Sequence, residues 1–159
     1  MQSPLALVLA LALASPLAAF AAADAHDHGK SAPHQLELNA GKKWGTDEAL
    51  RQAMSTIHGS VSKTLPAAHS GKASAADYDA FGNAVTAQVS YMVENCKLDP
   101  KADAQLHLIV AELMEGAETA QGKQGEKKRA AGVVQVAKAA NAYGKHFDHA
   151  GWRSIPMPH

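Results

Sequence analysis

Residues 74–100 read SAADYDAFGNAVTAQVSYMVENCKLDP, a stretch that contains the start, the apolar face and the end of one helix. Ser74, followed three residues later by Asp77, is the pattern of a capping box, in which each side chain bonds to the backbone of the other residue. The apolar residues recur at helical spacing: Tyr78, Phe81, Val85, Val89, Met92 and Cys96. Asp99-Pro100 follows, and an Asp cap with Pro at the first helical position begins a new helix.

The same pattern recurs on both sides of this stretch. Thr46 is expected to cap a helix that ends at Pro66, because Pro stops a helical run. The helix that begins at Asp99-Pro100 is expected to end near Gly122, and a last helix is expected over about 125–148. The apolar face of the first helix is Leu50, Met54, Ile57, Val61 and Leu65. That of the helix after Asp99-Pro100 is Leu106, Ile109, Val110, Leu113 and Ala117, and that of the last helix is Ala130, Val133, Val134, Ala137, Ala140, Asn141 and Gly144. Four such helices with short loops predict an all-α, antiparallel up-down-up-down four-helix bundle.

Composition excludes several classes of function. The 159 residues include 15 Lys and Arg against 15 Asp and Glu, so a net charge of zero gives no basis for nucleic-acid binding. One Cys cannot build a disulfide framework, a four-Cys zinc site or an iron–sulfur cluster. The length suits one domain.

The N-terminus has the pattern of a secretory signal. Residues 5–20 are mostly apolar, too short for a membrane span, and small residues follow that suit cleavage after Ala21, Ala23 or Ala25. We expect a signal peptide over 1–23, export to the periplasm, and a mature protein that is not an integral membrane protein. The expected organisation continues with a flexible His-containing arm over 24–45, the bundle over 46–149 and a C-terminal tail over 150–159.

The expected arm carries candidate metal ligands. Cleavage after Ala23 or Ala25 places His26 or His28 third in the mature chain. A free amine, two amides and a third-position imidazole form a square-planar nitrogen set that suits Cu(II) or Ni(II), and this set is similar to the amino-terminal copper site of serum albumin. The alternative is a solvated leader whose His residues bind nothing.

A second candidate site lies at the bundle end where the first and third helices begin. Counting 1.5 Å per residue places Met54, Met92, Cys96 and His107 near that end, and the tail could bring His149 across it. Thioether and thiolate sulfur are soft ligands suited to Cu(I), and imidazole also binds copper. The alternative is structural, because Met at helical spacing is usually core filler and a free Cys is usually buried.

Enzyme motifs are missing from the sequence. There is no His-Glu-x-x-His, no Gly-x-Ser-x-Gly and no Gly-rich phosphate loop, and neither Glu112 nor Glu115 begins a Glu-x-x-His pair. We therefore expect a protein that is not an enzyme.

Two resemblances extend this interpretation. The stretches at 44–47, 95–98 and 147–152 (Trp-Gly-Thr-Asp, Asn-Cys-Lys-Leu and Phe-Asp-His-Ala-Gly-Trp) resemble those of a group of small exported proteobacterial proteins. A periplasmic four-helix bundle also resembles the soluble b-type cytochromes, which implies noncovalent haem b. Met54 matches that family's first ligand, but Gly144 stands where its His would be, so Met54 and His107 would be the substitute pair.

The expected function is transition-metal binding, with copper as the metal, in a handling or resistance role. A haem-b electron carrier is one alternative. The other is a metal-free interaction or stress module that acts on a partner protein or forms a homodimer.

Overall fold

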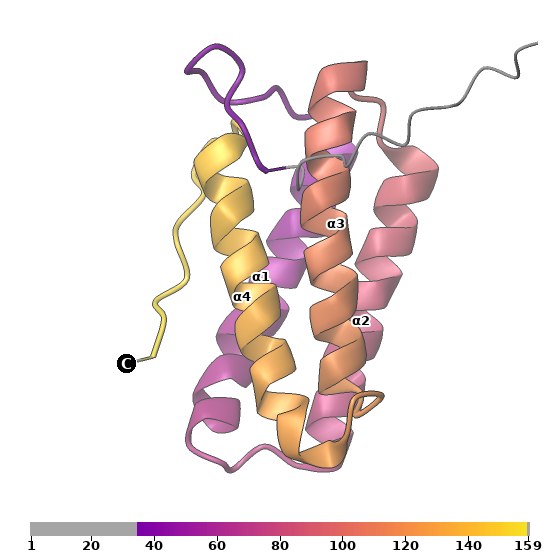
Figure 1. Ribbon diagram of the computed structural model, residues 1–159, viewed down its shortest axis with the longest axis vertical. Coiled ribbons are helices and arrows are strands. Elements are labelled where there is room, and N and C mark those ends of the chain that lie inside the picture. The colour runs from indigo at the N-terminus through magenta and orange to yellow at the C-terminus, as the bar shows by residue number, and fades with distance from the viewer. Residues whose placement is uncertain (1–34, 159) are drawn as a thin grey trace, which may run out of the picture. The chain divides into compact units, whose positions relative to one another are not determined.

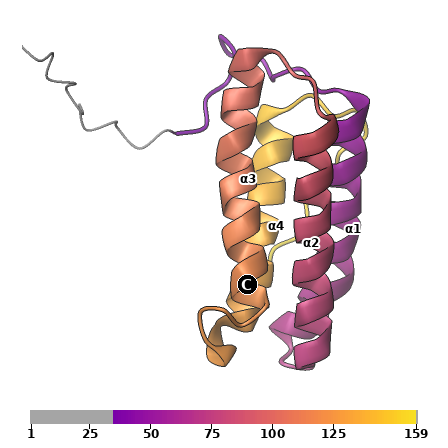
Figure 2. The ribbon, with the colours of Figure 1, turned by 90° about the vertical axis from the view of Figure 1, so that its right-hand side faces the viewer.

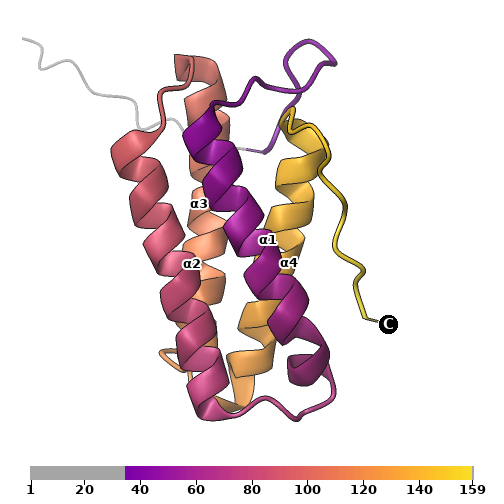
Figure 3. The ribbon, with the colours of Figure 1, turned by 180° about the vertical axis from the view of Figure 1, so that it is seen from behind.

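Four α-helices make up most of the part of the chain that the structure describes. The computed structural model describes residues 35–158, which contain α1 (Glu48–His69), α2 (Ala75–Asn95), α3 (Pro100–Ala120) and α4 (Arg129–His146), with a 3₁₀ turn, η1 (Glu126–Lys128), before α4 (Figure 1). Each helix packs against the next one, and α1 packs against α4. Successive helices run in opposite directions (Figures 2 and 3). The predicted all-α four-helix bundle is confirmed.

Helix starts follow from local capping, with one correction. The capping box of Ser74 and Asp77 and the Asp99 cap before Pro100 are both present, as predicted. The cap of α1 is Asp47 and not Thr46: Leu50 N–H donates to Asp47 Oδ1 at 2.7 Å. The Thr46 hydroxyl instead donates to the carbonyl of Asp148 at 2.6 Å, so a contact distant in sequence takes the side chain away from the helix start.

The predicted bounds of the first and last helices also differ from the structure. The first helix continues through Pro66 to His69. Pro66 removes only one backbone donor. The turn that follows it is still closed, because Ser70 N–H donates to the Pro66 carbonyl at 3.1 Å. The last helix cannot begin at Gly125, whose φ is +102°, and its regular part starts at Arg129. It ends at His146 because Phe147 is extended and pairs with Trp44.

The core consists mainly of the predicted apolar faces. Every predicted face residue of α1 is buried, and so are those of α2 except Cys96, which is half-buried. On α4 the prediction holds only in part: Val133, Ala137 and Ala140 are buried, whereas the other predicted residues (Ala130, Val134, Asn141 and Gly144) are half-buried. The buried face of α4 includes Tyr143, whose ring is completely buried and stacks on Phe147.

Residues 24–45 were predicted to be a flexible arm, and the end of this segment packs against the bundle through Trp44. Trp44 is only 7% exposed, and its backbone bonds to the chain after α4: its N–H donates to the His146 carbonyl and its own carbonyl accepts from Asp148 N–H, both at 2.8 Å. Its indole N–H donates to the Glu37 carbonyl at 2.6 Å. Burial of a large aromatic side chain stabilises this segment against the bundle.

The C-terminal tail lies along the bundle beside α1 and α4 (Figure 3). Asn141 bonds to both backbone groups of Ile155, accepting its N–H at 2.7 Å and donating to its carbonyl at 2.9 Å. Ile155 is buried. The tail is therefore part of the packed structure.

Helices α3 and α4 approach each other closely through glycines. A Cβ on Gly132 would lie 2.4 Å from the backbone N of Ala120 and 2.4 Å from the carbonyl O of Gly116. Backbone atoms cannot move aside as a flexible side chain can, so only Gly fits where these two helices cross.

We predict that Gly132→Ala lowers the free energy of unfolding by about 2 kcal/mol or more, because the added methyl must force the two helices apart. Gly59→Ala is the matched control: Gly59 lies inside α1 with open space around its Cβ position, so Ala there should stabilise by about 0.5–1 kcal/mol. Urea denaturation of both variants measures this. Equal effects of the two substitutions would contradict the close crossing.

Candidate functional site

A hollow of about 250 Å³ between α2 and α3 contains three of the residues selected from the sequence. Met92 and Cys96 line it from α2 and the residue that caps α2, and His107 lines it from α3. Its other lining residues are Val93, Asp103, Leu106 and Val110. We term this feature the α2–α3 hollow.

The polar and sulfur-bearing side chains of the α2–α3 hollow form two pairs. Met92 and Cys96 are four residues apart, and so are Asp103 and His107. Residues at this spacing lie on the same face of a helix. Two adjacent antiparallel helices therefore present a thioether, a thiol, an imidazole and a carboxylate to one space.

The position of Cys96 is fixed by the end of α2. Its N–H donates to the Met92 carbonyl at 2.9 Å, and its backbone is then extended. The next residue, Lys97, donates its N–H to Asp47 Oδ2 at 2.6 Å. The Asp47 carboxylate thus caps α1 and also holds the chain immediately after Cys96.

The environment of Cys96 favours the neutral thiol. Burial raises its pKa to about 11, and the negative charges of Asp47 and Asp103 act in the same direction. A neutral thiol is a poor nucleophile, so this Cys has none of the activation that catalytic cysteines show.

His107 is oriented by the residue one turn before it. Its Nδ1 lies 2.9 Å from the backbone carbonyl of Asp103 and 3.5 Å from the carboxylate Oδ2. Both are acceptors, so Nδ1 carries a hydrogen, and Nε2 is the ring nitrogen that a metal ion would use. Imidazoles that bind metals are commonly held this way, with the other ring nitrogen bonded to a carbonyl or carboxylate.

Met54 does not line the α2–α3 hollow with the other candidates. It is fully buried in the core, whereas the His107 side chain is 72% exposed. The two side chains therefore lie in different environments, Met54 in the core and His107 largely at the surface. His26 and His28 lie outside the described residues.

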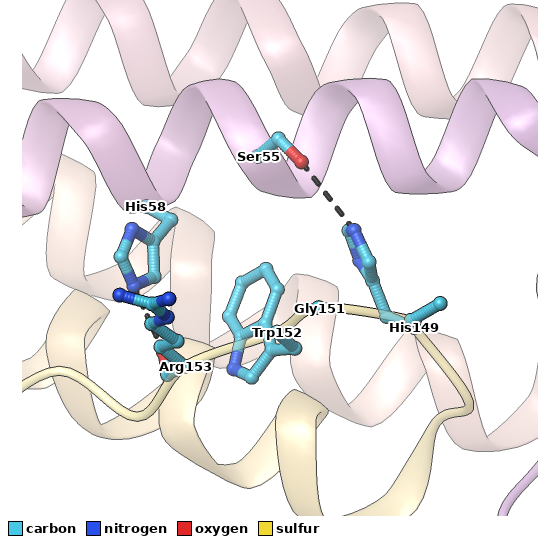
Figure 4. Close-up of a pocket in the computed structure, with 7 residues that line it drawn as sticks. Ser55, His58, His149, Gly151, Trp152 and Arg153 are labelled. Atoms are coloured by element: carbon cyan, nitrogen blue, oxygen red, sulfur yellow. Dashed lines mark hydrogen bonds between the residues drawn. The ribbon is translucent and has the colours of Figure 1, made fainter.

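His149 lies in a separate groove, here termed the tail groove (Figure 4). The groove has a volume of about 290 Å³ and runs between α1 and the tail, lined by Ser55, His58, His149, Ala150, Gly151, Trp152 and Arg153. His149 and His58 lie on either side of the Trp152 indole, each with its ring centroid 5.0 Å from that of Trp152. His149 is thus grouped with residues that were not selected as a site from the sequence.

Trp152 fills the space that Gly144 leaves on α4. A Cβ on Gly144 would lie 2.2 Å from the indole ring, so the indole occupies the place of a side chain. The sequence signal for this contact was the Gly in an inward position of the last helix, together with a Trp close behind it. The sequence alone did not predict that the Trp152 indole would fill the space at Gly144.

The hydrogen bonds of His149 favour a neutral ring. Its Nδ1 lies 2.9 Å from the hydroxyl of buried Tyr143, and its Nε2 lies 3.5 Å from Ser55 Oγ. The Tyr143 hydroxyl has no other hydrogen-bond partner among the described residues, so Nδ1 acts as its acceptor. Burial lowers the pKa of His149 below 6.5, and the positive charges of Arg51 and His58 lower it further.

Within residues 35–158, no three His, Cys, Asp or Glu side chains have the geometry to hold a metal ion. A metal in the α2–α3 hollow would therefore need the Met92 thioether as a ligand. In the same part of the chain, no helix combines the length and apolar character needed to cross a membrane.

Comparison with protein-family models, with curated proteins and with solved structures gives no match for this chain. The α2–α3 hollow and the tail groove are therefore the features from which a function is inferred.

The raised pKa of Cys96 predicts slow alkylation. At about pH 8, roughly one thiol in a thousand would be ionised, against about a quarter of unperturbed thiols. Modification by iodoacetamide, followed by mass spectrometry, should be about a hundredfold slower in the folded than in the urea-unfolded protein, and should accelerate about tenfold per pH unit up to about pH 10. Rapid alkylation that reaches its plateau below about pH 9 would contradict this environment.

The lowered pKa of His149 predicts acid sensitivity. The unfolded chain takes up a proton at His149 near pH 6.5, whereas the folded chain resists it. The free energy of unfolding should therefore be fully retained above about pH 6.5 and should fall as the pH decreases toward the folded pKa. Urea denaturation between about pH 5 and 7.5 measures the slope. His149→Gln removes this titration, so a variant with the same slope as the parent would show that His149 is not the cause.

Proposed function

We propose that this chain is an exported copper-binding protein that holds Cu(I) in the α2–α3 hollow and serves copper handling or resistance. The observation that supports the proposal is that Met92, Cys96 and the oriented His107 line one hollow between two adjacent helices. Sequence patterning placed these residues at one end of the bundle, but only the packing of α2 on α3 puts them around a common space.

The chemistry of this ligand set favours Cu(I). Two sulfur atoms and one imidazole nitrogen are soft or intermediate donors, which select Cu(I) over hard cations such as Mg²⁺ or Ca²⁺. His107 Nε2 provides the nitrogen, and Asp103 holds the ring through Nδ1. Cys96 would lose its proton on binding, so metal uptake would release a proton.

The N-terminal residues support the exported part of the proposal. A signal peptide over 1–23 would deliver the chain to the periplasm, where His26 or His28 at the mature N-terminus would capture Cu(II). The α2–α3 hollow would bind copper that arrives already as Cu(I), so the arm and the hollow would each hold one oxidation state without a transfer between them. Haem b is not favoured, because Met54 is buried in the core whereas the His107 side chain is largely exposed.

The test is a Cu(I) competition assay against a chromophoric chelator under reducing conditions. The parent should carry His26→Gln and His28→Gln, so that the arm does not contribute. Cys96→Ser should weaken Cu(I) binding by more than about 100-fold, and Met92→Leu and His107→Gln by about tenfold or more, since each removes one ligand.

Two substitutions serve as matched controls. Met54→Leu changes a thioether that does not line the α2–α3 hollow, and His149→Gln changes an imidazole of the tail groove. Both should leave the affinity unchanged. If Cys96→Ser binds Cu(I) as tightly as the parent, or if the parent binds none, the proposal fails and a metal-free interaction module becomes the better interpretation.

A further inference from the structure

The tail groove has features that the copper site does not use. It is walled by His58 and Ser55 from α1 and by His149 from the tail, with the Trp152 indole between the two imidazoles (Figure 4). Its volume of about 290 Å³ is at the lower end of the range for ligand pockets, so a small molecule would fit.

The charge of the tail groove has one sign. Arg153 is the only fully charged residue that lines it, and no carboxylate is among the lining residues. The positive charge of Arg51 also acts on His149. This environment opposes a bound cation and favours an anion.

The walls of the tail groove are held in place before any ligand arrives. The indole of Trp152 fills the position left open by Gly144, and the His58 Nε2–H donates to the Arg153 carbonyl at 2.9 Å. Two residues further on, Ile155 is fixed by Asn141. A preorganised groove loses little conformational entropy on binding.

We propose that the tail groove binds a small organic anion, a carboxylate carried on a flat apolar group. The apolar group would contact Trp152, and the carboxylate would bind the Arg153 guanidinium, which matches a carboxylate in geometry and charge. Ser55 would supply a neutral hydroxyl donor. This site is separate from the α2–α3 hollow and does not depend on copper.

Benzoate is the probe, and benzamide is its neutral control of nearly the same shape. Titration is followed by NMR at the imidazole signals of His58 and His149 and at the two indole N–H signals. The Trp44 indole does not line the groove and serves as an internal reference. Benzoate should give saturable shifts at His58, His149 and Trp152, and benzamide should bind about tenfold more weakly, because it lacks the charge-assisted contact.

Two variants that each lose one positive charge complete the test. Arg153→Gln should weaken benzoate binding about tenfold, and Lys138→Gln, an exposed lysine on α4, should leave it unchanged. The proposal is overturned if benzoate gives no saturable shift at the tail groove, if benzamide binds as well as benzoate, or if the two variants bind equally. Copper binding is measured independently, so failure here leaves the copper proposal intact.

Discussion

The arrangement of the helices at one end of the bundle depends on two hydrogen bonds to the Asp47 carboxylate. One of its oxygens caps α1 through Leu50 N–H, and the other accepts the N–H of Lys97 in the connection between α2 and α3. One side chain therefore joins the start of α1 to the connection between α2 and α3. Because Lys97 follows Cys96 directly, this contact also fixes the thiol beside Met92, and its negative charge helps to keep the thiol protonated. The same interaction serves the fold and sets the geometry of the candidate copper site.

The α2–α3 hollow and the tail groove offer different chemistry to a ligand. The hollow offers sulfur ligands and an oriented imidazole next to a carboxylate, whereas the groove offers imidazoles next to an arginine. A cation is favoured in the first environment and an anion in the second. His149 therefore belongs with Trp152 and His58, although its place near the end of the bundle had suggested copper.

Local signals in the sequence predicted much of this fold. The capping box at Ser74 and the apolar spacing of α1 and α2 depend on neighbouring residues, and these predictions hold. The prediction that Thr46 caps α1 is wrong, because its hydroxyl bonds instead to Asp148, about a hundred residues away. The match of Trp152 to Gly144 also depends on packing that no local pattern encodes. For the candidate copper site, the spacing along α2 predicted that Met92 and Cys96 share a face. That His107 lines the same hollow depends on how α3 packs against α2, which the spacing within one helix does not determine.

X-ray absorption at the copper edge, on the Cu(I)-loaded protein with His26→Gln and His28→Gln, tests the central claim most directly, because it reports the ligand atoms themselves. The account predicts a copper ion with two sulfur neighbours and one imidazole nitrogen, from Met92, Cys96 and His107. A first shell made only of nitrogen and oxygen atoms would contradict it, since copper would then be bound outside the α2–α3 hollow.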